Sequence, residues 1–166
     1  MLDNGVTYRC DGIGTATGPD LVIGGAYNGL PVTEIKANAF QNNYSIKRVT
    51  ILDTITSLPN TSFGSCASLT ELNLSIMLSG NIGLYEFDST GITEITIPPL
   101  VKNVFGRSFS NCKQLKTVKF LGTPALIQDT VFLNSTNITD IYVPWAEGAV
   151  ANAPWGATNA TIHYNS

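Results

Sequence analysis

Hydrophobic residues recur along this chain with a period of about 23 residues. Phenylalanine marks the period most clearly, with gaps of 23, 24, 22 and 23 residues between Phe40, Phe63, Phe87, Phe109 and Phe132. After each phenylalanine come three apolar residues at positions n, n+3 and n+5: Ile46/Val49/Ile51, Leu69/Leu72/Leu74, Ile92/Ile95/Ile97, Leu115/Val118/Phe120 and Ile138/Ile141/Val143. Regular spacing of this kind predicts an internal repeat.

The spacing within each triplet predicts one strand per repeat. Its last two members are two residues apart, so their side chains point to the same side of a strand. Stacked repeats would then form a parallel sheet from segments near 48–52, 71–75, 94–98, 117–121 and 140–144. A repeat of this length leaves no room for a full helix beside the strand, so we expect short turns or 3₁₀ pieces.

Further apolar residues predict the opposite wall of a narrow core. One lies five residues before each phenylalanine, at Ile35, Leu58, Ile82, Val104 and Ile127. Another lies eight residues before, at Val32, Ile55 and Val101, whereas Ser79 and Pro124 stand there in the remaining two repeats. The repeat with Ser79 is also one residue longer. We therefore expect irregular turns before Phe87 and Phe132.

Two segments carry a resemblance to a known family. They are Tyr27-Asn-Gly-Leu-Pro-Val-Thr-Glu-Ile35, followed by Ala39-Phe40, and Ser108-Phe-Ser-Asn-Cys-Lys-Gln-Leu-Lys-Thr-Val118. They resemble the BspA-type leucine-rich repeats of bacterial surface proteins, and the end of the chain resembles an ending found also in phage-encoded members. The resemblance implies a leucine-rich-repeat solenoid of stacked parallel strands, with about five repeats of 22–24 residues. It also implies a recognition or adhesion module rather than an enzyme.

The ends of such a stack need cover, because each repeat buries the core face of its neighbour. We expect one continuous domain with an N-terminal cap at 1–30, leucine-rich repeats at 31–144 and a C-terminal cap at 145–166. Trp145 and Trp155 would supply bulky apolar cover in the second cap. The alternative is that the two rings form a ligand platform, because Trp is enriched at binding hot spots.

Composition narrows the partners. Only 13% of residues are charged, the net charge is −3, and Thr, Asn and Ser together supply 46 of the 166 residues. Without a basic stripe we expect no nucleic acid partner, and no apolar run is long enough for membrane insertion. The start at Met1 shows no secretion signal. We therefore expect a mature fragment of an extracellular surface protein, or a virion component that bypasses secretion.

Little in the sequence suggests catalysis, a metal or a cofactor. His163 is the one histidine, and no Gly-x-Ser-x-Gly segment accompanies it. Cys66 and Cys112 occupy equivalent positions two repeats apart, about 10 Å, which is beyond disulfide reach, so we expect free thiols. The glycines from Gly12 to Gly18 have the wrong spacing for a dinucleotide loop and predict a turn. We expect no required metal and no cofactor.

The outward residues of the predicted sheet are the candidate binding site. The candidate face comprises Arg48, Thr50, Glu71, Asn73, Glu94, Thr96, Lys119, Asp140 and Tyr142. Arg48 is expected beside Glu71, and Lys119 beside Tyr142, our preferred single contact. The function expected is non-enzymatic recognition of a protein or glycan on a host or cell surface. The alternative is a tail or capsid decoration that contacts neighbouring virion proteins, and an exposed cap or edge could join copies of the chain into a homo-oligomer.

Overall fold

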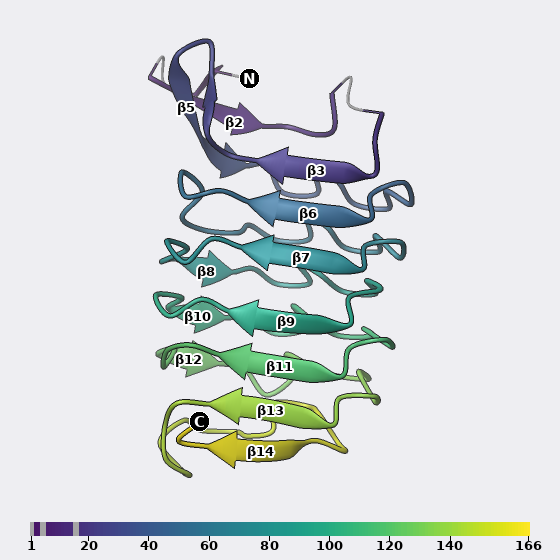
Figure 1. The fold of residues 1–166 in the computed structure, drawn as a ribbon, viewed down its shortest axis with the longest axis vertical. Coiled ribbons are helices and arrows are strands. Elements are labelled where there is room, and N and C mark those ends of the chain that lie inside the picture. The colour runs from purple at the N-terminus through teal and green to yellow at the C-terminus, as the bar shows by residue number, and fades with distance from the viewer. Residues whose placement is uncertain (1, 4–5, 15–16) are drawn as a thin grey trace.

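The protein is a stack of parallel strands with one strand per turn of the chain (Figure 1). The computed structural model describes residues 2–3, 6–14 and 17–166. One row of strands, here called the front row, is β3 (Asp20–Ile23), β6 (Arg48–Ile51), β7 (Glu71–Leu74), β9 (Glu94–Ile97), β11 (Thr117–Phe120), β13 (Asp140–Val143) and β14 (Thr161–Tyr164). The solenoid prediction is confirmed, but the row has seven strands because β3 and β14 continue it into both segments expected to act as caps.

A second row of short strands forms the opposite wall of the core. It consists of β8 (Asn81–Ile82), β10 (Asn103–Val104) and β12 (Leu126–Ile127), which pair in parallel. Ile82, Val104 and Ile127 are the residues five positions before a phenylalanine, and all three are buried. Between the two rows lie the predicted inward residues of the front strands, which are buried except for the half-buried Leu74.

The five repeated phenylalanines form one continuous stack inside the solenoid. Ring centroids of successive members are 5.0, 5.5, 5.4 and 6.0 Å apart, and the rings are tilted by 11°, 11°, 16° and 26°. Each ring is at most 2% exposed. The spacing follows from the repeat, because successive turns are separated by about 4.8 Å along the stack. The regular phenylalanine period therefore encodes a column of rings.

The chain turns sharply on both sides of each phenylalanine instead of forming a helix. The residue two positions after each one has a positive φ: Asn42, Ser65, Ser89, Asn111 and Asn134. Asparagine adopts this conformation more readily than most residues, which explains part of the asparagine content. Such residues interrupt each run of short i→i−3 hydrogen bonds, and the described residues contain no α- or 3₁₀-helix. Of the two expectations, short turns are therefore the one confirmed.

The longer repeat interrupts the front row. β3, β6 and β7 form one sheet, and β9, β11, β13 and β14 form another, so β7 and β9 are neighbours without ladder pairing. The extra residue lies in the turn after β7, where the buried Leu78 takes the core place that Ser79 leaves open. In the other repeat predicted to be irregular, Pro124 is itself buried and the back strands stay paired.

The two ends are built differently. At the N-terminal end, β1 (Leu2–Asp3), β2 (Thr7–Cys10), β5 (Leu30–Ile35) and β4 (Ala26–Tyr27) form a small sheet in that order. Part of the Gly12–Gly18 turn lies outside the described residues. At the C-terminal end, Trp145 and Trp155 are 6% and 0% exposed. Their rings pack on each other and on Phe120, which favours the covering role and makes the ligand-platform alternative wrong.

Candidate partner-binding face

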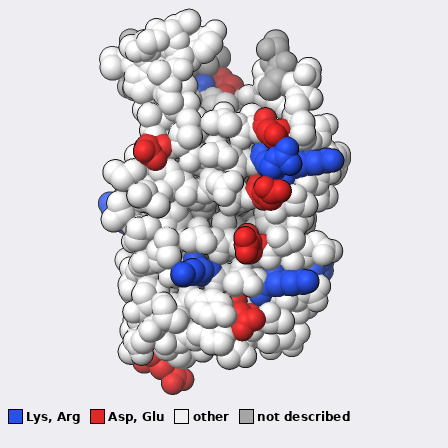
Figure 2. All heavy atoms as spheres, in the orientation of Figure 1, with Lys and Arg blue, Asp and Glu red and all other residues white. Residues whose placement is uncertain are grey.

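Outward residues of the front row form two columns, because alternate side chains point away from the core and the strands are in register. The first column is Asp20, Arg48, Glu71, Glu94, Thr117, Asp140 and Thr161, and the second is Val22, Thr50, Asn73, Thr96, Lys119, Tyr142 and His163. All nine candidate residues belong to these columns. Figure 2 shows acidic and basic groups mixed over this face, with wide uncharged areas around them.

Sequence reasoning missed the residues at both ends of the columns. Asp20, Val22, Thr161 and His163 belong to the face although their segments were assigned to caps. The apolar alternation of Leu21 and Ile23 is the signal for the first strand. It was obscured because the hairpin of β4 and β5 lengthens the distance from Asp20 to its partner Arg48 to 28 residues.

Arg48 is engaged at the N-terminal end of the face. Its guanidinium Nη2 lies 2.6 Å from Asp20 Oδ1 and donates a hydrogen bond of 2.7 Å to Asp20 Oδ2. The strand register does place Arg48 beside Glu71, as expected. The ion pair, however, is made on the other side, with a residue that sequence analysis had placed in the cap. Because this ion pair neutralises its charge, Arg48 should attract a partner less strongly than its exposure suggests.

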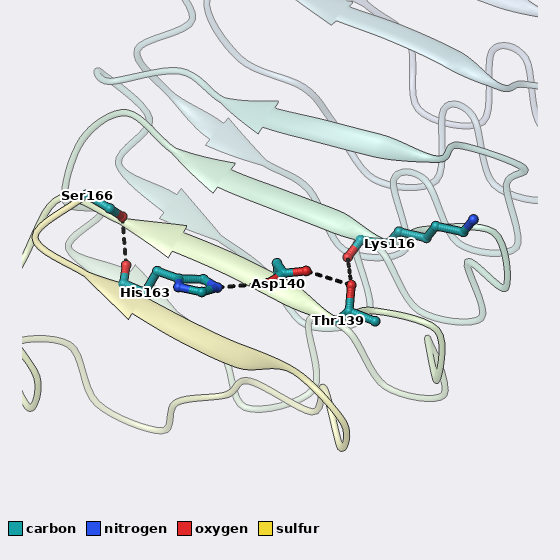
Figure 3. Close-up of polar contacts among 5 residues, drawn as sticks. All are labelled: Lys116, Thr139, Asp140, His163 and Ser166. Carbon is teal, nitrogen blue, oxygen red and sulfur yellow. Dashed lines mark hydrogen bonds and ion pairs between the residues drawn. The ribbon is translucent and has the colours of Figure 1, made fainter.

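A second group of contacts occupies the C-terminal end (Figure 3). Nε2 of His163 lies 2.8 Å from Asp140 Oδ1, and the Thr139 hydroxyl donates to Asp140 Oδ2 at 2.8 Å. The hydrogen bond with His163 is the main cause that lowers the pKa of the Asp140 carboxyl, and the Thr139 hydroxyl adds to it. The His163 ring also stacks on Tyr142, with centroids 4.4 Å apart. Tyr142 is consequently held flat and half-buried rather than projecting into solvent.

The His163 group lacks the arrangement of a hydrolytic triad. The hydroxyl of Ser166 donates to the backbone carbonyl of His163 at 2.8 Å, as Figure 3 shows, and not to the imidazole. Among the described residues, the imidazole has one hydrogen-bonded partner, Asp140. A triad needs a nucleophile on the second ring nitrogen. The hydrogen bond between His163 and Asp140 instead connects β14 to β13.

The centre of the face remains open. Glu71, Asn73, Glu94, Thr96 and Lys119 are exposed, and within the described ranges none of their charged groups forms an ion pair. Thr50 is half-buried between them and the N-terminal end. Glu71 and Glu94 lie on the neighbouring strands β7 and β9, so two unpaired carboxylates stand on either side of the interruption between the two sheets. This centre suits a partner with basic and hydrogen-bonding groups.

The cysteines Cys66 and Cys112 lie in the core, away from this face. Cys66 and Cys112 are free and buried, as expected, and their thiols donate to the carbonyl oxygens of Phe40 and Phe87. Burial raises the pKa of each thiol to about 11. The equivalent Ser135 makes the same kind of bond to Phe109. The part of the chain that the structure describes holds no group of three or more His, Cys, Asp or Glu residues placed to bind a metal ion.

Comparison with protein families identifies the repeat. The model of the BspA type leucine rich repeat region matches residues 33–149 with six copies. The chain belongs to the BspA-type leucine-rich repeat family. Six copies exceed the five repeats expected from the phenylalanine spacing, although β3 and β14 both lie outside the matched residues. A comparison with curated protein sequences finds no match.

Solved structures of other leucine-rich repeat proteins share the fold. A leucine-rich repeat protein from Bacteroides ovatus is 18% identical with a TM-score of 0.55, over 87% of this chain and 41% of that one. A leucine-rich repeat protein from T. pallidum is 21% identical with a TM-score of 0.64, over 76% of this chain and 59% of that one. This chain therefore spans about half the length of these structures, and the likeness concerns the fold alone.

Membership in the BspA-type family carries a coarse functional statement. Repeats of this type are typical of bacterial surface proteins, and leucine-rich repeats generally serve binding rather than catalysis. Within the described residues, no helix is long and apolar enough to cross a membrane.

Proposed function

We propose that this BspA-type chain is a non-enzymatic recognition module that binds a protein partner at a cell surface through the centre of its front row. The observation that supports the proposal is a difference between the ends and the centre of the face. Residues at both ends contact other residues of the chain, whereas those at the centre are exposed. Arg48 and Asp140 form ion pairs or hydrogen bonds within the chain, whereas Glu71, Glu94 and Lys119 form no ion pair with any residue that the structure describes. An exposed sheet with unpaired charges of both signs provides electrostatic selectivity for a complementary surface.

The shape of the surface supports a protein or extended glycan rather than a small molecule. Seven short strands present an elongated face, and stacked repeats use such faces for large partners. Small ligands are instead bound in concave, mostly apolar pockets. Of the two large classes, we favour a protein because the two open carboxylates and one lysine match the ionic rims of protein interfaces.

A binding screen with matched variants tests the proposal. The labelled chain is screened against purified surface proteins and glycans, and each binder is measured again by calorimetry. We expect the double variant Glu71→Gln/Glu94→Gln to weaken protein binding about five- to thirtyfold, since loss of two complementary contacts costs about 1–2 kcal/mol. Lys119→Ala and Tyr142→Ala probe the flank of the same site. Glu147→Gln, an exposed carboxylate outside the front row, is the control.

Unchanged affinity in all three face variants would move the site off the front row. Binding of glycans alone would contradict the protein class and retain the surface. The virion role expected as an alternative stays a prediction, in which the same face contacts neighbouring particle proteins. Genes for portal, tail or capsid proteins beside this one would support that role over the free surface module.

A further inference from the structure

One edge of the front row is open at the N-terminal end. β3 is the terminal strand of its sheet, and among the described strands it pairs with β6 alone. The carbonyl oxygens of Pro19 and Ile23 accept hydrogen bonds from the β6 side. Because alternate residues of a strand in a parallel ladder bond to one neighbour, the N–H and C=O groups of Asp20 and Val22 point to the open edge.

This edge borders a cavity. Its volume is about 630 Å³, and it lies between β3 and β2, with Cys10, Ile23 and Val32 among the residues that line it. Tyr8 and Tyr27 form another part of its wall, packed edge to face with centroids 5.2 Å apart. Figure 2 shows a hollow at this end of the molecule. In the repeats that follow along the chain, the corresponding space is filled by the inward side chains of the neighbouring front strand.

The other end of the row differs in this respect. β14 is also a terminal strand, but Trp145 and Trp155 fill the core at that end. A strand added to β14 would gain backbone hydrogen bonds and little apolar burial. A strand added to β3 would gain both, because its inward side chains would enter the cavity. Exposed edges with an adjacent apolar pocket are the features that strand addition uses.

We propose that the open edge of β3 binds an extended polypeptide segment of a partner protein as an additional parallel strand. The strand register determines which type of residue the segment needs at each position. Two aliphatic side chains two residues apart face the cavity, as Val49 and Ile51 face the core in β6. The residue beside Asp20 points outward and need not be basic, because the Asp20 carboxylate already pairs with Arg48 on the other side. This site is separate from the central face proposed above.

A peptide copied from this chain provides the probe. Residues 46–53, with blocked termini and a fluorescent label, carry β6, the strand that pairs with β3 on its other edge. We expect saturable one-to-one binding measured by fluorescence anisotropy. A peptide with Val49→Asp and Ile51→Asp should bind at least tenfold more weakly, because charged groups would have to enter the cavity.

Backbone methylation separates strand addition from other modes. In β6 the amides of Arg48 and Leu52 face the strand before it, and the carbonyl of Ile51 faces the strand after it. In the bound peptide the groups of Val49 and Ile51 would therefore face β3. N-methylation at those two residues should abolish binding, whereas N-methylation at Arg48 and Thr50 should leave the affinity within about threefold.

Variants of the chain test the same edge. Val22→Pro removes the N–H that faces the open edge, and an edge strand tolerates proline at such a position. We expect at least tenfold weaker peptide binding, with Val22→Thr as the matched control that keeps the N–H. Alkylation of Cys10 supplies an independent readout that needs no variant. Cys10 lines the cavity and is half-buried, so bound peptide should slow its reaction with iodoacetamide.

Several results would overturn the proposal. They are absence of saturable binding, equal behaviour of the two methylated peptides, or an unprotected Cys10 at saturating peptide. Self-association of the chain that the peptide fails to displace would assign the edge to a second copy instead. Glu71→Gln/Glu94→Gln should leave peptide binding unchanged, so failure at the edge is distinguishable from failure of the central face.

Discussion

Glu86 is a charged residue type at a position where the neighbouring repeats have a small polar residue. It precedes Phe87, and the equivalent residues one repeat before and after are Ser62 and Ser108. The side chain is fully buried, and its Oε2 accepts a hydrogen bond of 2.7 Å from the Ser62 amide. Its Oε1 and the Ser108 hydroxyl have no hydrogen-bond partner among the residues that the structure describes. Burial therefore raises the pKa of this carboxyl well above its ordinary value.

The raised pKa predicts a stability that falls with increasing pH. The folded chain holds the Glu86 proton to higher pH than the unfolded chain does, so stability is fully present below the ordinary glutamate value and declines as pH rises through the folded value. Each unit of the rise corresponds to about 1.4 kcal/mol. We expect Glu86→Gln to remove this decline and to be more stable than the parent at pH 8. Urea unfolding from pH 4 to 9 measures it, with Glu71→Gln as the exposed control.

Asp140 behaves in the opposite sense. Because the His163 and Thr139 hydrogen bonds lower its pKa, its contribution to stability is present above the ordinary aspartate value and is lost as pH falls through the lowered one. The group is solvent-exposed, so the effect on the whole chain should be small. Carboxyl NMR titration should show Asp140 titrating below the ordinary range of an aspartate, and His163→Ala should raise its pKa. An unchanged pKa in that variant would contradict the fastening role of His163.

The phenylalanine stack is the element that ties the repeats together. Each ring contacts the ring of the next repeat, so removal of one affects two interfaces. We expect Phe87→Ala to lower the free energy of unfolding by about 3–5 kcal/mol, because it leaves a cavity in the middle of the stack. Phe87→Leu should cost about 1 kcal/mol. Chemical unfolding measures both, and Tyr44→Ala, at a side chain 65% exposed, should have little effect.

The sequence predicted the parts of the fold that repeat. Phenylalanines and inward aliphatic residues follow the period, because each must fill the same place in every turn, and all were located correctly. The strands β3 and β14 were missed as members of the front row because a hairpin and a tryptophan-rich turn break the period beside them. The ion pair of Arg48 and the ring stacking of Tyr142 could not be predicted either, because their partners Asp20 and His163 lie in those two strands.

At the scale of the whole molecule, stability depends on how the ends are closed. Trp155 is completely buried, and its indole N–H donates to the Ala151 carbonyl oxygen at 2.8 Å. Its own carbonyl accepts the hydrogen bond that the Phe132 amide donates at 2.9 Å, which continues the ladder of the preceding turns. The cap thus serves as the last turn of the stack while it covers the core.

We expect Trp155→Ala to lower the free energy of unfolding by about 3–5 kcal/mol, since it removes a large buried ring. Trp155→Phe keeps the apolar cover and loses the indole hydrogen bond, so it should cost about 1–2 kcal/mol. Fluorescence-detected unfolding, with hydrogen exchange of the β13 and β14 amides, measures both. If Trp155→Ala were as stable as the parent, the ring would not be the closure of this end.

The interruption between β7 and β9 has a mechanical consequence. Two hydrogen-bonded blocks meet there, joined on the front side without ladder bonds and on the opposite side by bonds such as Phe63 N to Glu86 O. Such a joint is stiff against sliding and compliant against bending, so the solenoid should flex there first. Glu71 and Glu94 stand on either side of this hinge. A partner that binds both carboxylates would connect the two blocks across this joint. The bound molecule would then bend less and become straighter and more rigid.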